Sequence, residues 1–259
     1  MKKKLSIIKI GGNVIENEGE LQKFLDTFAT MEGLKILVHG GGKLATQIAS
    51  RLGIESQLIG GRRITDAESL KVITMVYGGL ANKNIVAQLQ ARNTNAIGLS
   101  GADGNTIRAI KRPVKEIDYG FAGDVEEVDA RAIDRLLKAG FTPVFCAITH
   151  NKEGLLLNTN ADTIASEVAI GMSDEYDTTL YYCFEKKGVL LDIANEDSVV
   201  THLEPEYYQE LLKKKIIADG MLPKLEKCFH ALHKNVGKVC IGDVGMLAPQ
   251  ATLYTTITL

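Results

Sequence analysis

Short apolar runs that end at glycines are the dominant pattern in the first part of the chain. The run Leu34–Val38 is followed by His39, glycines 40–42 and Lys43, and apolar residues at helical spacing then continue to about Leu52. This pattern predicts a strand, a tight turn and a helix. Glycines at such a junction let the backbone approach a ligand, and the helix N-terminus attracts phosphate or carboxylate. A purely structural turn of an α/β protein would look the same.

A second junction of this kind stands near the beginning of the sequence. The run Leu5–Ile10 predicts a strand that leads into Gly11 and Gly12, and the helical pattern over Glu20–Thr30 returns to the next strand. A right-handed βαβ connection places both glycine loops at the carboxyl edge of a parallel sheet, where such sheets bind ligands. Lys9 would put an ammonium group beside phosphate there, unless it is only an edge-strand lysine before a turn.

The rest of the chain continues the alternation of strands and helices. Residues 105–128 alternate and carry Gly120 and Gly123, which predicts hairpins that cover the site. Because no linker separates the parts of the chain, we expect any lobes to share one continuous sheet or to pack tightly. Strands are predicted over Ala96–Leu99, Thr142–Cys146, Thr179–Phe184, Gly237–Ile241 and Leu253–Leu259, and helices over 129–138, Glu204–Lys214 and from about 221 past His230.

The segment after the second helix combines glycines, arginines and a helix start. Thr65 and Glu68 have the spacing of a capping box, and Leu70, Ile73, Tyr77 and Leu80 share one helical face. Arg63 stands between a double glycine and this helix. Such a guanidinium suits a two-pronged contact with a carboxylate, whereas a solvated surface arginine is the structural alternative.

Two charged residues in the second half are further candidates. Asn158 and Asn160 are predicted on one strand face, and Asp162 falls at the start of the next helix. Asp162 either stabilises that helix N-terminus or orients nearby lysines. Lys224 follows Pro223 in the first turn of another predicted helix, or just beyond it.

Composition narrows the possible partners. The 259 residues carry 30 basic and 32 acidic side chains, for a net charge of −2, so we expect a small-molecule partner rather than nucleic acid or a membrane surface. The basic start resembles a signal peptide, but glycines interrupt its apolar run, and no run is long enough to span a membrane. The four cysteines lack C-x-x-C spacing, which predicts buried, reduced thiols in a cytoplasmic protein.

Two common nucleotide motifs fit the glycine loop poorly, and a metal site is not expected. The Walker pattern fails, because only Gly40 and Gly41 precede Gly42 and Lys43. The dinucleotide pattern is met by Gly40, Gly42 and Ala45, but the acidic residue expected about 20 residues later is missing. His230 and His233 share a helical face without a third ligand, so we predict no metal site.

Taken together, the motifs resemble those of the acetylglutamate kinases of the amino-acid kinase family over nearly the whole chain. No single motif is specific, but their order and spacing are. The matching motifs are Lys9-Ile10-Gly11-Gly12, His39-Gly40-Gly41-Gly42-Lys43, Arg63-Ile64-Thr65-Asp66, Gly98-Leu99-Ser100-Gly101, Asn158-Thr159-Asn160-Ala161-Asp162 and Gly220-Met221-Leu222-Pro223-Lys224.

The resemblance implies a three-layer αβα sandwich with two lobes around a mostly parallel sheet. Residues 1–172 would form the acyl-amino-acid-binding and dimerisation lobe, and residues 173–259 the nucleotide-binding lobe of a homodimer. The implied reaction transfers the γ-phosphoryl group of ATP, with Mg²⁺, to the γ-carboxylate of N-acetyl-L-glutamate in arginine biosynthesis. The implied site comprises catalytic Lys9, Lys224 and Asp162, substrate-binding Gly41, Gly42, Arg63 and Asn158, phosphate-binding Gly11 and Gly12, and nucleotide-binding Glu185, Gly188, Ile217 and Ala218.

The chain departs from the family pattern at three places. Arg62 stands where the family usually has leucine, and this extra cation makes an N-succinyl substrate, with its second carboxylate, an alternative to acetyl. The nucleotide turn over 183–188 is atypical, which leaves the ATP contacts open. Because Lys9 lies so near the start, we expect a dimer without the N-terminal helix and the arginine feedback of hexameric relatives.

Other functions remain open at this point. Within the fold, a carbamate, aspartate or uridylate kinase is possible, but the Arg63 segment and the Asn158–Asp162 pattern favour an acylglutamate. A nucleotide-binding regulator would keep the glycine loops and lose the charges, whereas this chain keeps Lys9, Asp162 and Lys224. A dinucleotide oxidoreductase rests on the weak glycine motif alone.

Overall fold

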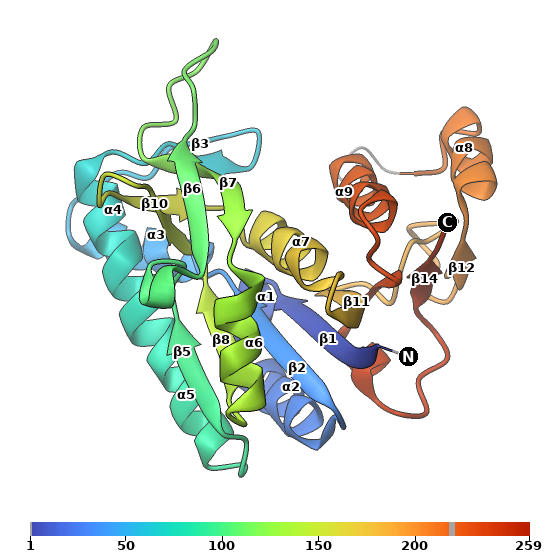
Figure 1. Ribbon diagram of the computed structural model, residues 1–259. Helices are drawn as coiled ribbons and strands as arrows, with labels where there is room; N and C mark the ends of the chain where they lie inside the picture. The colour runs from blue at the N-terminus through green and yellow to red at the C-terminus, as the bar shows by residue number, and fades with distance from the viewer. Residues whose placement is uncertain (1, 218–220) are drawn as a thin grey trace.

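One eight-stranded sheet runs through the whole molecule (Figure 1). The computed structural model describes residues 2–217 and 221–259. Neighbouring strands are parallel except β13 and β14, so the sheet is mostly parallel, as predicted. Its strands, in spatial order, are β12 (His202–Leu203), β14 (Thr255–Ile257), β13 (Lys238–Gly242), β11 (Tyr176–Cys183), β1 (Lys3–Ile10), β2 (Leu34–His39), β8 (Thr142–Cys146) and β5 (Ala96–Leu99).

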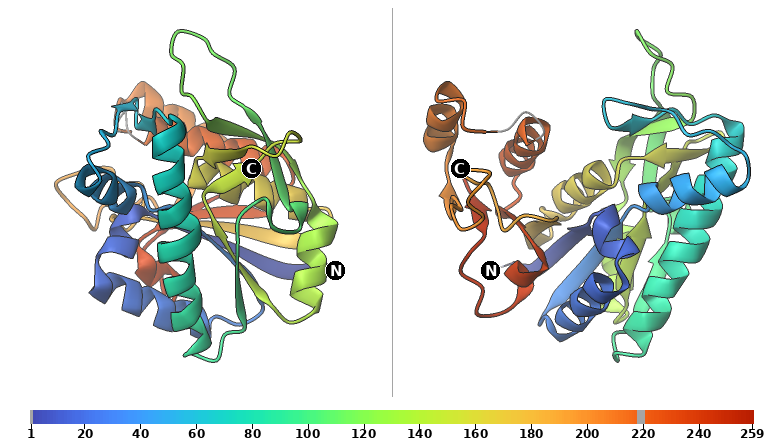
Figure 2. Two further views of the ribbon diagram at one scale, coloured as in Figure 1. Left: turned by 90° about the vertical axis from the view of Figure 1, so that its left-hand side faces the viewer. Right: turned by 180° about the vertical axis from the view of Figure 1, so that it is seen from behind.

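Helices cover both faces of this sheet, which gives the three layers. Figures 1 and 2 show α8 and α9 together at the side of the C-terminus, away from α4 and α5. The α-helices are α1 (Gly12–Glu16), α2 (Glu18–Thr30), α3 (Gly42–Arg51), α4 (Ala67–Ile73), α5 (Asn82–Gln90), α6 (Ala130–Lys138), α7 (Ala161–Met172), α8 (Pro205–Lys213) and α9 (Leu222–His233). A π-helix η1 (Thr74–Ala81) joins α4 to α5, and short 3-10 turns form η2 (Asp103–Asn105) and η3 (Val244–Leu247).

Alternating residues of the central strands supply two separate cores. Leu5 and Ile7 of β1 face the core that includes α7 and α9, whereas Ile8 and Ile10 face the core of α2 and α5. All four side chains are at most 1% exposed. A parallel strand buried on both faces reads as a continuous apolar run, which is why β1 and β2 were recognisable in the sequence.

The βαβ unit that carries both glycine loops forms as predicted. Strands β1 and β2 are parallel neighbours, and α2 lies between them in sequence. Lys35 of β2 donates to the carbonyls of Phe28, Ala29 and Met31 at the end of α2. These bonds satisfy carbonyls that the helix end leaves free, and they explain a buried lysine in this strand.

A smaller sheet and a hairpin stand above the carboxyl edge of the main sheet (Figure 1). The hairpin is formed by β3 (Leu58–Ile59) and β4 (Arg62–Arg63). The predicted hairpin within residues 105–128 is confirmed, because β6 and β7 pair antiparallel. The small sheet closes on itself as a barrel, with the strand order β10 (Leu156–Thr159), β7 (Ala122–Val128), β6 (Ile107–Lys111) and β9 (Ile148–His150).

Three local predictions were wrong. Asp66, not Thr65, caps α4 by accepting from the Ser69 N–H, because Thr65 is held in a strand-like pairing with Gly120. The prediction that Leu80 shares one buried helical face with Leu70, Ile73 and Tyr77 was wrong. Leu80 is 45% exposed, because the π-helix η1 has more residues per turn than an α-helix. Asn160 lies beyond the strand and caps α7, where its side chain accepts from the Thr163 N–H.

Other predictions agree with the described residues. Asp129 caps α6 through the Ala132 N–H, and all four cysteines are buried and free. Gly120 has a φ of +63°, and a Cβ there would lie 2.2 Å from the Thr65 carbonyl oxygen, so this pairing requires glycine. Within residues 2–217 and 221–259, no helix combines the length and apolarity needed to cross a membrane.

Candidate active site

An ion pair between Lys9 and Asp162 lies at the carboxyl edge of the main sheet. Lys9 precedes the last residue of β1, and Asp162 is in the first turn of α7, which packs on β1. The Lys9 Nζ lies 2.7 Å from the Asp162 Oδ1, and the two side chains are 16% and 20% exposed. Burial alone would raise the pKa of Asp162, but the positive charges of Lys9, Lys224 and Lys227 hold it below its usual value. The carboxylate is therefore ionised and surrounded by cations.

Helix α9 brings two more lysines toward this carboxylate. The Lys224 Nζ lies 4.4 Å from the centroid of the Phe184 ring, a distance at which a cation and an aromatic ring attract. Burial is the main reason that the pKa of Lys224 is lowered, and Asp162 opposes this shift. The positive charges of Lys9 and Lys224, which are far apart in sequence, thus both lower the pKa of the Asp162 carboxyl group.

The two glycine loops meet beside this ion pair. Gly12 and the glycines 40–42 line one cavity of about 230 Å³ together with Lys9 and Asp162. Gly41 has a φ of +152°, and a Cβ there would lie 3.1 Å from the Tyr77 ring, so only glycine fits. Gly11 precedes α1 as its N-terminal flanking residue. Backbone N–H groups of such loops are suited to phosphate or carboxylate.

A buried histidine supports the second glycine loop from below. His39 is fully buried, its Nδ1 lies 2.8 Å from the Gly40 carbonyl, and its Nε2 lies 3.0 Å from the Asn82 side-chain nitrogen. Burial lowers the pKa of His39 to about 4, so the ring is neutral at pH 7. A neutral ring can donate from Nδ1 to Gly40 and accept at Nε2 from Asn82, which fixes the loop.

Polar side chains from three elements form the opposite wall of the cavity. The Arg63 guanidinium donates to the Gly42 carbonyl at 2.9 Å and to the Thr46 hydroxyl at 2.6 Å. Asn158, at the end of the small sheet, donates to the Thr65 hydroxyl at 3.0 Å. Both residues line the cavity. The volume of this cavity is below the range typical of sites for larger ligands, so it suits a compact ligand such as an amino-acid derivative.

Sequence reasoning missed four residues at or beside this cavity. Tyr77 was assigned only to a helical face, Asn160 only to a strand face, and neither Arg112 nor Lys227 was singled out. Tyr77, Arg112 and Asn160 line the cavity. The Lys227 Nζ contacts the Asn160 side-chain oxygen at 3.4 Å and the Thr163 hydroxyl at 3.2 Å. Only Lys227 left a local signal, because it follows Lys224 at the i, i+3 spacing of one helical face.

The residues predicted to bind nucleotide lie in two places. Gly188 and Ile217 line a cavity of about 230 Å³ whose other walls are mostly apolar. Glu185 instead lines a separate, wider cleft. Ala218 lies outside the described residues. The remaining walls of the apolar cavity are formed by Lys186, Val189, Leu190, Ile193, Ile216 and Met221.

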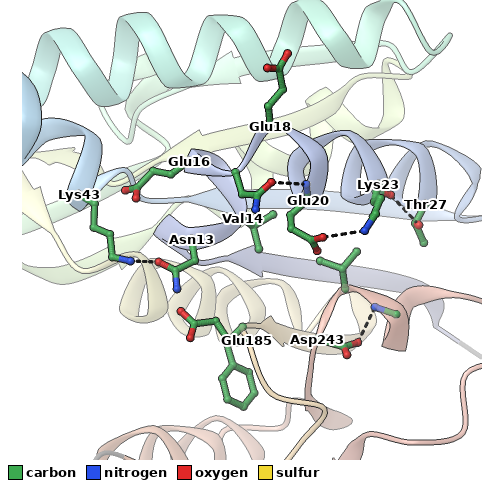
Figure 3. Close-up of a pocket in the computed structure, with 14 residues that line it drawn as sticks. Asn13, Val14, Glu16, Glu18, Glu20, Lys23, Thr27, Lys43, Glu185 and Asp243 are labelled. Carbon is green, nitrogen blue, oxygen red and sulfur yellow. Dashed lines mark hydrogen bonds and ion pairs between the residues drawn. The ribbon is translucent and has the colours of Figure 1, made fainter.

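The wider cleft has a volume of about 1130 Å³ and lies between α1, α2 and the C-terminal part of the chain (Figure 3). Its acidic residues outnumber its lysines. This balance of charge disfavours a triphosphate and favours the glycine loops and Lys9 as the anion-binding region. The charged residues of the cleft are Glu16, Glu18, Glu20, Glu185, Asp243, Lys23 and Lys43.

A protein-held metal ion finds no support among the described residues. Within residues 2–217 and 221–259, no group of three or more histidine, cysteine, aspartate or glutamate side chains is arranged to hold a metal. His230 and His233 both lie on α9.

Comparison with known proteins identifies a family and relatives of the chain. Residues 4–243 match the model of the Amino acid kinase family. The chain is 56% identical over 241 residues to the "Acetylglutamate kinase" of Phocaeicola vulgatus, covering 93% of this chain and 94% of that one. It is 55% identical over 241 residues to the "Acetylglutamate kinase" of Bacteroides fragilis strain ATCC 25285, covering 93% and 92%.

A solved structure confirms the fold. The N-acetylglutamate synthase of Neisseria gonorrhoeae, in complex with coenzyme A and N-acetyl-glutamate, superposes with a TM-score of 0.82 at 20% identity. The match covers 99% of this chain and 59% of that longer one.

Proposed function

The chain belongs to the amino acid kinase family, and on this premise we propose that it transfers the γ-phosphoryl group of ATP to the γ-carboxylate of N-acetyl-L-glutamate. The product is an acyl phosphate, and the reaction belongs to arginine biosynthesis. The observation that carries the proposal is the convergence of Lys9, Asp162 and Lys224 beside two glycine loops. This arrangement suits phosphoryl transfer, in which the protein mainly positions the reactants and neutralises charge.

The charges of the two substrates decide what the protein must supply. The γ-carboxylate is already a nucleophile at neutral pH, so the reaction needs no general base. Bringing it in line with the γ-phosphoryl group forces two anions together, and cations where charge accumulates relieve that repulsion. We assign this role to Lys9 and Lys224, and we assign Asp162 to orienting them. Its ionised carboxylate lies 2.7 Å from the Lys9 ammonium, and the positive charge of Lys224 helps to lower its pKa.

The acylated amino acid is proposed to occupy the cavity beside the ion pair. Arg63 supplies a guanidinium for the α-carboxylate, and the Asn158 side chain and the N–H groups of Gly41 and Gly42 supply further polar contacts. The Arg63 bonds to Gly42 and Thr46 fix its side chain before substrate arrives. Pre-organisation of this kind reduces the entropy lost on binding.

The nucleotide is proposed to bind in the C-terminal lobe. The apolar cavity that contains Gly188 and Ile217 suits the flat faces of an adenine ring. Glu185 follows Phe184 and lines the wider cleft. We assign Gly11 and Gly12 to the phosphates, because Gly12 lines the cavity of Lys9 and Asp162 and Gly11 precedes it at the start of α1. Ala218 remains a sequence-based prediction. We expect Mg²⁺ to enter with ATP, because Mg²⁺ is commonly held largely by substrate phosphates.

Trapping the product with hydroxylamine tests the reaction. Purified protein is incubated with MgATP and N-acetyl-L-glutamate, and the acyl phosphate is captured as a hydroxamate while ADP is measured separately. We expect equal amounts of hydroxamate and ADP. ATP hydrolysis without hydroxamate, or no ADP release above background, contradicts the proposed function.

We also propose the lobe boundary and a homodimer. The division into residues 1–172 and 173–259 falls between α7 and β11. On the N-terminal lobe, η1 exposes 57% of Met75 and 45% of Leu80, an apolar pair suited to a contact with a second copy. Light scattering of wild type and Leu80→Lys tests this, with a dimer expected only for the wild type. We also propose a cytoplasmic location, because the proposed reaction uses ATP.

A further inference from the structure

Two arginines form the wall between the acyl-binding cavity and a second cavity. Arg62 and Arg112 both line the cavity that contains Arg63 and Asn158, and both line an adjoining space of about 760 Å³. Arg62 lies on β4, next to Arg63. Arg112 follows β6, at the base of the loop that projects from the molecule in Figures 1 and 2. The acyl end of the cavity therefore has a cationic wall.

Lys227 faces this wall from the other lobe. Its ammonium group lies against Asn160, which lines the same cavity. Burial lowers the pKa of Lys227, Asp162 opposes that shift, and Arg62, Lys9 and Arg112 lower the pKa further by repulsion. The two lobes thus present like charges to one another beside the acyl-binding cavity.

The nearby acids do not balance these charges within the acyl-binding cavity. Asp124 pairs with Arg112, and Asp162 pairs with Lys9. Glu116 lines the adjoining space, together with Lys115, but not the acyl-binding cavity itself. Among the residues that the structure describes, Arg62 and Lys227 take part in no ion pair. Facing cations without counter-ions repel one another, so an anionic group between them would be attracted strongly.

The position of this cationic cluster (Arg62, Arg112 and Lys227) indicates which substrate supplies the anion. Arg62 is adjacent to Arg63, which we assign to the acylated amino acid, and the nucleotide is assigned to the cavity of Gly188 and Ile217. The α- and γ-carboxylates of the substrate already have partners in Arg63 and in the two catalytic lysines. An acetyl group carries no charge and would leave the cluster without an anion.

We propose that the cluster of Arg62, Arg112 and Lys227 is a subsite for a third carboxylate, so that the enzyme also accepts glutamate whose N-acyl group ends in a carboxylate, such as N-succinyl-L-glutamate. The proposal rests on the proposed function, because the transferred phosphoryl group still goes to the γ-carboxylate. Arg62 offers a two-pronged contact, and Lys227 adds a point charge from the other lobe. Arg112, held by Asp124, fixes the wall behind them.

Steady-state kinetics with two substrates tests the subsite. The ratio of kcat/KM for N-succinyl-L-glutamate to that for N-acetyl-L-glutamate is measured in the full-length protein by hydroxamate formation and ADP release. We expect the wild-type ratio to lie above about 0.1. Arg62→Leu should lower the ratio about 10-fold to 100-fold, because a charge-assisted hydrogen bond to the third carboxylate is lost. Lys227→Met keeps the apolar stem and should lower the ratio in the same direction.

The control is Arg131→Leu, which removes one positive charge from an exposed position on α6 and should leave the ratio unchanged. Thermal unfolding of each variant shows whether it is folded. A wild-type ratio below about 0.1, or a ratio that changes less than about threefold in both Arg62→Leu and Lys227→Met, overturns the subsite while leaving the proposed function intact. Failure of the wild type to phosphorylate either substrate overturns both.

Discussion

Replacing Asp162 with asparagine removes one negative charge from the site and keeps the shape of the side chain. In the wild type, this carboxylate lies 2.7 Å from the Lys9 ammonium and lowers the repulsion among Lys9, Lys224 and Lys227. At an effective dielectric constant of about 20, the attraction between Lys9 and Asp162 is about 6 kcal/mol before solvation is considered. Desolvation of the two ions offsets most of it. Because both side chains retain some exposure, we expect Asp162→Asn to lose about 1–3 kcal/mol of unfolding free energy.

The effect on turnover should exceed the effect on stability. Without the carboxylate, Lys9 and Lys224 lose the charge that holds them together where phosphoryl transfer would occur. Loss of one preorganised electrostatic group commonly lowers kcat about 10²–10³-fold, and we expect a loss of this size for Asp162→Asn. KM for N-acetyl-L-glutamate should change less, because the residues assigned to its binding are intact.

The assay combines hydroxamate-coupled kinetics with urea unfolding, and Asp174→Asn serves as the control. Asp174 is exposed just beyond the other end of α7, so its substitution should change stability by less than about 0.5 kcal/mol. The folded-state pKa of Asp162 is lowered, so its contribution to stability is present above pH 3.8 and is lost as pH falls below that value. The difference between wild type and Asp162→Asn should therefore shrink in acid. A folded Asp162→Asn protein with kcat within threefold of the wild type would refute the orienting role.

Three further predictions address the other lysine, the backbone and pH. Lys224→Met should lower kcat about 10²–10³-fold in the ADP-release assay, whereas the exposed Lys152→Met should not, and equal kcat values would remove Lys224 from the mechanism. Gly120→Ala should lower the free energy of unfolding in urea by about 2–4 kcal/mol, because the new Cβ meets the Thr65 carbonyl. Gly154→Ala, at a φ of +82° in open space, should lower it by only about 1–2 kcal/mol. Equal losses would contradict the steric argument. The pKa of His39 falls from 6.5 to about 4 on folding, so the wild type should lose about 3 kcal/mol between pH 6.5 and pH 4, and His39→Gln should show a flatter decline over that range.

The features predicted correctly from the sequence are those with a local physical signal. The continuous apolar runs identified β1 and β2 because strands buried on both faces have no polar alternation. Asp129 was recognisable as a helix cap because its side chain bonds an N–H group three residues later. Lys9 and Asp162 belong to two separate motifs, which only the family resemblance connected. Their ion pair shows that the two motifs meet in the fold.

The features that were missed depend on contacts between distant segments. Thr65 has the spacing of a cap, but its backbone pairs with Tyr119 and Phe121, so the cap shifts by one residue to Asp66. Nothing within the Arg112 segment places it at the cavity that contains Arg63 and Asn158, because that position depends on the pairing of β6 with β7 and of β7 with β10.

The packing of α7 explains how residues so far apart form one site. This helix packs on β1, β2 and β11 of the sheet and on α9, so its N-terminus holds Asp162 in a fixed place relative to both Lys9 and Lys224. The arrangement is electrostatically incomplete by itself, because one carboxylate faces three lysines. Anionic substrates supply the missing charge, and they are attracted most strongly to the place where the cations converge. The excess of positive charge causes repulsion within the free protein. We expect the same excess to attract both ATP and the acylated amino acid to this place.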